Sequence, residues 1–73
     1  MDVRARVGQN VQKLRRDRDL SQEELAHRAN VHQTYLSGVE SGKRNPSVMV
    51  LERIATALEV DISDFFRQPK KAK

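Results

Sequence analysis

Residues 22–42, with the sequence QEELAHRANVHQTYLSGVESG, predict two short helices joined by a tight turn. Ser21 suits the N-cap of the first helix, and Glu24 three residues later completes a capping-box pattern. Asn30 lies where the chain must turn, and Asn tolerates a left-handed backbone better than any residue except Gly. Helical spacing then resumes, and Gly42 is placed to end the second helix. The rest of the chain is expected to be organised around this pair.

The second helix of the pair has two different faces. Leu36, Val39 and Glu40 form one stripe. The opposite stripe holds small or hydrogen-bonding residues, namely Gln33, Thr34, Ser37, Gly38 and Ser41. When a short preceding helix presents such a face to solvent, the face suits the edges of bases in a major groove.

Three further helices are expected outside this pair. Apolar residues at helical spacing predict one helix over residues 3–18, with Arg and Lys on its outer face. The next helix carries an apolar stripe made of Val48, Leu51, Ile54, Ala55 and Leu58. Asp61 suits the N-cap of a last short helix, whose apolar residues are Ile62, Phe65 and Phe66.

Four segments of the chain carry a family resemblance: VGQNVQKLR, LSQEELAHRANV, YLSGVESGKRNPS and LERIATALEVDISDFF, which together span roughly residues 7–66. In register over the five predicted helices, they resemble the phage-repressor and Cro-like (Xre) family of helix-turn-helix transcriptional regulators. The resemblance implies an all-α, compact five-helix DNA-binding domain, lambda-repressor-like, that usually acts as a homodimer. Asp19 departs from the family pattern, which has Gly at this turn, and is expected to carry some backbone strain.

The chain of 73 residues is expected to form one small domain over residues 1–68, followed by a disordered basic tail over residues 69–73. A core of this size rarely supplies more than about 3–5 kcal/mol. The sequence has no Cys, so neither disulfides nor thiolate metal sites can add stability, and we expect no metal or other cofactor. Dimerisation is the remaining means of stabilisation.

The net charge of +4 gives weak support to a nucleic-acid partner. Three of the 14 basic residues, Lys70, Lys71 and Lys73, lie in the tail, which leaves 11 against 10 acidic residues. The first eighteen residues are more informative, because six basic side chains there oppose only Asp2 and Asp17. No apolar run is long enough for a membrane span or a signal peptide, and we expect a cytoplasmic bacterial or phage protein without a membrane partner.

The residues expected to read bases are Gln33, Thr34, Ser37, Gly38 and Arg44. Gln can bond adenine N6 and N7 together, and Thr offers a hydroxyl and a methyl group for thymine. Gly38 costs about 1 kcal/mol relative to Ala inside a helix, which close approach to DNA or simple sequence drift would explain. Arg44 can reach a guanine or a phosphate. The alternative for all of these polar residues is that they are only solvated.

The residues expected to contact phosphates are Gln22, His32, Tyr35, Lys43 and Asn45. The role of Gln22 is implied by the family resemblance, and the positive N-terminus of its helix supports it. Tyr35 either donates its hydroxyl to a phosphate or packs against the next helix. His32 stands where the family has a Ser or Thr N-cap, and neutral His is a poor cap. A protonated His32 facing a phosphate is therefore a hypothesis.

Two further residue sets are expected to be structural. Arg15 and Glu40 match an ion pair by which the family ties its first helix to the end of its third, and a lone carboxylate at Glu40 would be costly on the inward face. Phe65 and Phe66 cannot both face inward from a short helix, so one is expected in a dimer contact. Met49 and Val50 would join that contact; in the alternative, Phe66 packs against its own domain.

Together these features predict a sequence-specific regulator, a repressor or autoregulator, that binds a two-fold-symmetric operator as a homodimer. Its half-sites would lie about 10–10.5 base pairs apart. This fits the controller of a restriction–modification operon, and no effector domain for a small molecule is apparent. Two alternatives are an antitoxin with a toxin partner and a protein-interaction module that has lost DNA binding. An enzyme is not expected, because no nucleophile–base pair, metal cluster or phosphate loop is present.

Overall fold

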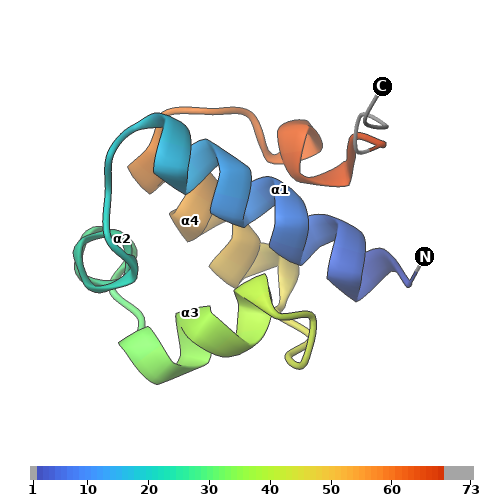
Figure 1. The fold of residues 1–73 in the computed structure, drawn as a ribbon, viewed down its shortest axis with the longest axis horizontal. Coiled ribbons are helices and arrows are strands. Elements are labelled where there is room, and N and C mark those ends of the chain that lie inside the picture. The colour runs from blue at the N-terminus through green and yellow to red at the C-terminus, as the bar shows by residue number, and fades with distance from the viewer. Residues whose placement is uncertain (1, 69–73) are drawn as a thin grey trace.

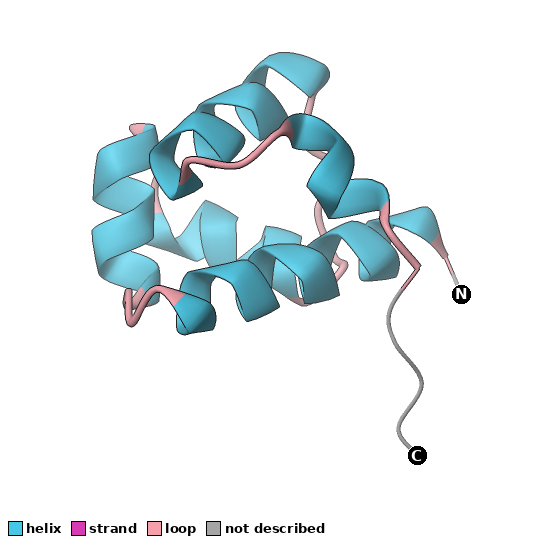
Figure 2. Ribbon diagram, turned by 90° about the horizontal axis from the view of Figure 1, so that it is seen from above, coloured by secondary structure: helices cyan, strands magenta, loops and turns pink. Residues whose placement is uncertain are grey.

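The computed structural model describes residues 2–68, and within them the chain forms four α-helices and one 3-10 helix (Figures 1 and 2). The elements in order are α1 (Val3–Asp17), α2 (Gln22–Ala29), α3 (Gln33–Glu40), α4 (Val48–Leu58) and η1 (Ile62–Phe66). The predicted all-α class is confirmed. The expected tail at 69–73 lies outside the described residues.

The expected last short helix is present as η1, but it is a 3-10 helix, so the expected count of five helices is not confirmed. Asp61 caps it as expected, by accepting a hydrogen bond from the Ser63 N–H at 2.9 Å. A 3-10 helix has three residues per turn, so residues three apart lie on the same side. Ile62 and Phe65 are therefore directed together against the core, whereas Phe66 faces away from it. In this five-residue segment, the 3-10 helix turns Ile62 and Phe65, which are three residues apart, toward the core together.

The core lies between the helices, and each of them contributes to it. In Figure 1, α1 crosses the molecule and packs against α3 and η1, while α2 packs against α3 and α4. The largest fully buried side chains are Val11, Leu25, Leu36, Val39, Ile54, Leu58 and Phe65. None of the elements within residues 2–68 covers one side of α3, at the edge of the molecule in Figure 1.

All four α-helices end in a left-handed residue. After α1, α2 and α4, the residues Asp19, Asn30 and Glu59 adopt φ angles of 55°, 59° and 60°. In each case the next residue is apolar, and its N–H bonds back to a carbonyl oxygen five residues earlier, which is the Schellman pattern. The left-handed turns at Asp19 and Asn30 are thus confirmed. The turn at Glu59 was not anticipated, since Glu is not a residue that favours this conformation.

The C-cap of α3 differs from the other three in the residue after the left-handed position. Gly42 takes that position as predicted, with φ of 78°, but the next residue is the exposed Lys43 rather than an apolar side chain. The other three caps are succeeded by Leu20, Val31 and Val60, which pack on or into the core. The residue after this cap is therefore not held by an apolar contact with the core, and residues 43–45 continue as an exposed loop.

Two contacts that the sequence did not reveal fix α1 against the rest of the fold. A Cβ atom on Gly8 would lie 2.5 Å from the carbonyl oxygens of Val39 and Glu40, so α1 approaches the end of α3 too closely for any side chain there. Asn10 donates its side-chain amide to the carbonyl oxygens of Phe65 and Arg67, at 2.8 and 2.9 Å. These contacts set the position of α3 and η1 relative to α1.

Candidate nucleic-acid interface

The uncovered side of α3 carries the face that the sequence predicted to be polar. Gln33, Thr34 and Ser37 are exposed there, and Gly38 is half-buried. The side chains of Leu36 and Val39 point inward, and these residues keep at most 1% of their surface exposed. The predicted division of this helix into an inner and an outer face is therefore confirmed.

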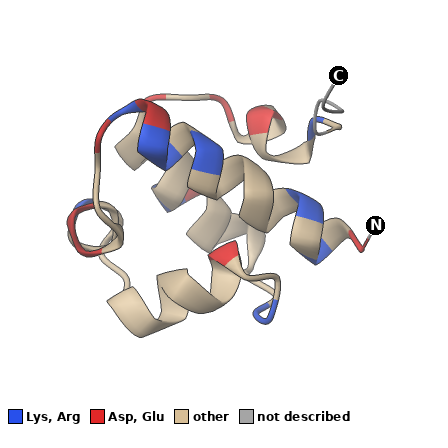
Figure 3. Ribbon diagram, viewed as in Figure 1, with Lys and Arg blue, Asp and Glu red and all other residues tan. Residues whose placement is uncertain are grey.

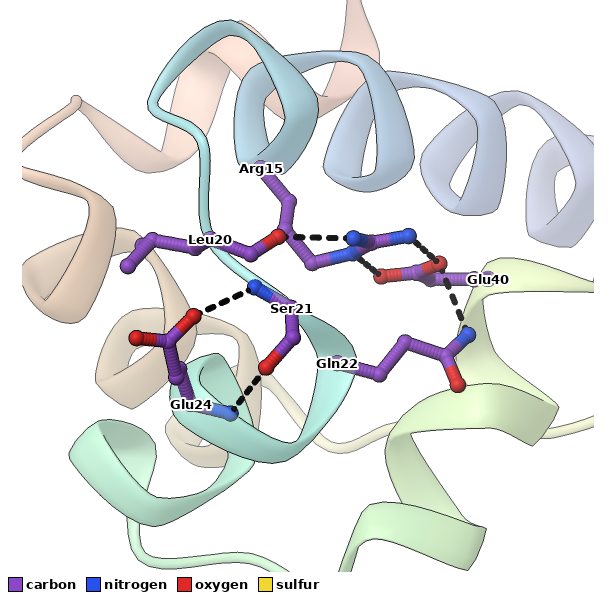
Figure 4. Close-up of polar contacts among 6 residues, drawn as sticks. All are labelled: Arg15, Leu20, Ser21, Gln22, Glu24 and Glu40. Atoms are coloured by element: carbon purple, nitrogen blue, oxygen red, sulfur yellow. Dashed lines mark hydrogen bonds and ion pairs between the residues drawn. The ribbon is translucent and has the colours of Figure 1, made fainter.

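The N-termini of α2 and α3 differ in how they are capped. Ser21 and Glu24 form the predicted capping box at α2: the Ser21 hydroxyl accepts from the Glu24 N–H at 3.0 Å, and the Glu24 carboxylate accepts from the Ser21 N–H at 2.8 Å (Figure 4). The second of these bonds lowers the pKa of Glu24. His32 occupies the N-cap of α3 with an exposed side chain and makes no capping hydrogen bond, so the expectation of a weak cap is confirmed.

A buried polar network joins α1, α2 and α3 (Figure 4). Arg15 binds both carboxylate oxygens of Glu40, at 2.7 and 3.1 Å, and donates a third hydrogen bond to the Leu20 carbonyl oxygen at 2.8 Å. Arg15 and Glu40 retain only 8% and 7% of their surface. Such a two-bond pair fixes geometry as well as charge. The network therefore ties the C-terminal end of α3 to α1 and to the turn before α2.

Gln22 belongs to the same network, which the sequence pattern did not reveal. Its side-chain amide nitrogen donates to a Glu40 oxygen at 3.0 Å, and its side chain is half-buried between α2 and α3. The amide group has a second hydrogen, and the first N–H groups of α2 lie beside it. The phosphate contact expected of Gln22 therefore stays a prediction, made by a side chain that the fold already orients.

The loop after α3 is anchored to the end of that helix, chiefly through the carbonyl group of Gly38. The Gly38 oxygen accepts hydrogen bonds from the Lys43 and Arg44 N–H groups, at 2.9 and 3.1 Å, and from the Ser41 hydroxyl at 3.1 Å. Lys43, Arg44 and Asn45 are all exposed. The charge-coloured ribbon shows the basic tip of this loop beyond the end of α3 (Figure 3).

Gly38 has a neighbour at close range, as a Gly inside a helix allows, whereas its approach to DNA stays a prediction. A Cβ atom at this position would lie 2.5 Å from Cγ of Arg44, so the residue leaves room for that side chain. The Arg44 guanidinium carbon then lies 5.7 Å from the centre of the Tyr35 ring, within reach of a cation–π interaction. The ring of the half-buried Tyr35 thus lies against the guanidinium group of Arg44.

The charge on α3 itself is small. Its sequence, QTYLSGVE, holds no Lys or Arg, and its one carboxylate is bound to Arg15 (Figure 3). The positive charge next to the outer face therefore comes from Lys43 and Arg44 of the following loop.

The residues predicted to form a dimer contact do not all lie at the surface. Phe65 is wrong as an interface residue, because it is fully buried in the core of its own domain, and Val50 is half-buried against that core. Phe66 and Met49 are exposed by 42% and 71%. Val3 and Val48 are exposed as well, by 53% and 70%, so the place of Val48 in the apolar stripe of its helix is wrong: it lies in the first, uncovered turn of α4. A groove of about 200 Å³ separates the start of α1 from the start of α4, and Val7, Pro46, Leu51 and Phe66 are among its lining residues.

Two negative findings apply to residues 2–68. No group of three or more His, Cys, Asp or Glu side chains in this part of the chain could hold a metal ion. None of the helices described there is long and apolar enough to cross a membrane.

Two short helices at a left-handed turn, the second with a free polar face, define a helix-turn-helix domain. The family model described as "Helix-turn-helix" matches residues 11–65. The chain is 48% identical over 60 residues to an HTH-type transcriptional regulator, y4dJ, of Sinorhizobium fredii, covering 82% of this chain and 78% of that protein. It is 39% identical over 71 residues to the control protein C.MunI of Mycoplasma, covering 96% of each.

Solved structures give the same result. The restriction-modification controller protein C.AhdI of Aeromonas hydrophila superimposes with a TM-score of 0.85 at 36% identity, covering 86% of this chain and 96% of that one. The chain therefore belongs to the helix-turn-helix family of transcriptional regulators, in its phage-repressor and Cro-like (Xre) branch, as the resemblance implied.

Proposed function

We propose that this protein binds a two-fold-symmetric DNA operator as a homodimer and represses transcription, including that of its own gene. The observation that carries the proposal is the uncovered polar face of α3, held in place by the buried Arg15–Glu40 network and flanked by a basic loop. Helices of this motif enter the major groove with their N-terminal residues toward base edges.

The assignment of roles rests on the position of each side chain. Gln33, Thr34 and Ser37 would contact base edges, with Arg44 beside them at the loop. Phosphate contacts would come from residues around that face, namely Gln22, His32, Tyr35, Lys43 and Asn45. Contacts of the first kind select a sequence, whereas those of the second kind set the position of the protein on the duplex.

The dimer would use the apolar surface at the start of α1 and α4. Val3, Val48 and Phe66 are exposed there and line the apolar groove between these helices, and Met49 is exposed next to Val48 in the chain. A group of exposed large apolar side chains on a small domain is typical of an interaction surface. With two copies joined there, two α3 helices would meet successive major grooves.

A controller of restriction–modification genes is the particular role that we favour within this class. C.AhdI carries that description and C.MunI is described as a control protein, and each of them matches over nearly its whole length.

The test is selection of bound duplexes from a randomised pool at about 150 mM salt, because non-specific binding falls steeply with salt. An enriched two-fold-symmetric motif, with half-site centres about 10–10.5 base pairs apart, would support the proposal. Sedimentation of the free protein at several concentrations would show whether it dimerises. Weak binding without an enriched motif would refute DNA reading and favour a protein-interaction role, such as that of an antitoxin.

A further inference from the structure

The exposed polar face of α3, called the recognition face below, has no side chain at Gly38. The side chain of Arg44, from the following loop, occupies the space at that position. Gly38 lies in the interior of α3, where Gly destabilises a helix relative to Ala. Its neighbour in space is Arg44, whose Cγ, Nε and Cδ would lie 2.5, 3.3 and 3.4 Å from a Cβ atom at residue 38. Three atoms along one side chain at these distances mean that the Arg44 stem runs across the bare backbone of Gly38.

Two further contacts fix where this stem begins and ends. The Arg44 N–H donates to the Gly38 carbonyl oxygen at 3.1 Å, which ties the start of the side chain to α3. The guanidinium at its end lies 5.7 Å from the ring centre of Tyr35. Tyr35 and Gly38 are three residues apart on a helix and so are neighbours on its surface. Arg44 is thus held along the outside of α3 at both ends.

We propose that Gly38 and Tyr35 are positioning residues that hold the Arg44 guanidinium on the recognition face, where it reads a guanine of the operator. The inference rests on the proposed function. Since α3 contains no Lys or Arg, a cation that reads bases must come from outside the helix. Arg is suited to guanine because it bonds O6 and N7 together, and a side chain already ordered in the free protein loses less freedom on binding.

The role of Gly38 in this proposal is to position Arg44, not to contact DNA itself. A side chain of any kind at residue 38 would displace Arg44, because its Cβ atom would overlap Arg44 Cγ. Tyr35 provides a flat ring under the guanidinium, for which its hydroxyl is not needed. The loop cap described above serves the same end, since it brings Arg44 back along α3 without burying it.

The experiment measures G38A, R44A and the double variant against the duplex selected by the wild-type protein. We expect G38A to bind about tenfold more weakly, within the range given by loss of one bidentate base contact. In the R44A background, G38A should change the affinity by less than about twofold, because the displaced side chain is already gone. A repeated selection with G38A should lose preference at one guanine and keep it elsewhere.

Controls separate positioning from general damage. G38A should melt at the wild-type temperature or above it, because Ala is the better helix former. Y35F retains the ring and should keep the wild-type preference at the guanine, whereas Y35L should lose that preference. Any loss of affinity that Y35F shows equally on all sequences would measure a phosphate contact of the Tyr35 hydroxyl, not the positioning of Arg44. In NMR spectra of the free protein, the Arg44 side-chain protons should show a ring-current shift that both G38A and Y35L remove.

Each possible failure has a distinct meaning. A wild-type protein that selects no motif overturns the proposed function and with it the reading of a guanine by Arg44. A wild-type protein that selects a motif, with G38A binding equally well or weakening the R44A variant further, overturns only the positioning by Gly38. A loss of affinity that is uniform over all sequences would make Arg44 a phosphate contact and overturn the guanine assignment.

Discussion

Replacing Arg15 by Ala removes the cation from the most buried polar cluster of the fold. It leaves the Glu40 carboxylate, whose side chain is 2% exposed, with Gln22 as its remaining side-chain donor, and it also frees the Leu20 carbonyl oxygen. Removing one partner of a buried pair costs about 3–5 kcal/mol, because the other charge stays buried without compensation. That is comparable to the whole stability of about 3–5 kcal/mol that a core of this size supplies.

We therefore expect Arg15→Ala to be largely unfolded at 25 °C, or to melt more than about 10 °C below the wild type. The measurement is helical circular dichroism during thermal and urea unfolding, at fixed protein concentration because a dimer gains stability from association. The matched control is Lys13→Ala, which removes an exposed ion pair with Asp17 on the same helix and should change stability by less than about 1 kcal/mol.

The outcome that would refute this reasoning is an Arg15→Ala variant that melts within a few degrees of the wild type. It would mean that water reaches the Glu40 carboxylate, or that the charge of Glu40 contributes little to the cost. A Glu40→Gln variant distinguishes these cases, since it keeps an acceptor for Arg15 without the charge.

Three other predictions concern DNA binding, dimerisation and pH. Gln33→Ala should weaken operator binding by about 1–3 kcal/mol and relax the preference at one position, whereas Lys43→Ala should weaken binding to all sequences and lower the salt slope by about 1; exchanged effects in a binding titration would show that the two roles are reversed. Phe66→Asp should shift sedimentation toward the monomer with helicity retained, whereas Phe65→Ala should cost about 3–5 kcal/mol of folding free energy, because only Phe65 is in the core; a Phe66→Asp protein that still dimerises would exclude this surface. The pKa of Glu24 is lowered in the folded state from its ordinary value of 4.5, so its stabilising effect is present above that pH and is lost as the pH falls through the folded pKa. Glu24→Gln should therefore lose less stability than the wild type between neutral and acid pH, and equal losses in thermal unfolding would contradict this.

Most of the helices and the two faces of α3 could be predicted because they depend on residues close together in the chain. The capping box joins Ser21 to a residue three positions later, and the turn at Asn30 depends on the backbone preference of that residue itself. A helical face requires only spacing, which the chain displays directly. The left-handed Glu59 could not be predicted in the same way, since its conformation is imposed by Val60 turning back onto the core.

The candidate site was predicted in outline, and its internal contacts were not. The polar residues of α3 and the basic loop are visible as a pattern. By contrast, the bond between Gln22 and Glu40 and the passage of Arg44 over Gly38 depend on where elements come to lie in space. Residue 38 illustrates the limit: a mid-helix Gly signals that something comes close, without showing which group it is.

The sequence by itself determined the helical class, the helix pair, its caps and the face left for a ligand. These depend on local backbone preference and on the period of apolar residues. Only the tertiary structure decided that Phe65 is buried and Phe66 exposed, that Gly8 lets α1 contact the end of α3, and that η1 is a 3-10 helix. Each of these depends on distances between segments far apart in the chain, which packing fixes and spacing along the chain does not encode.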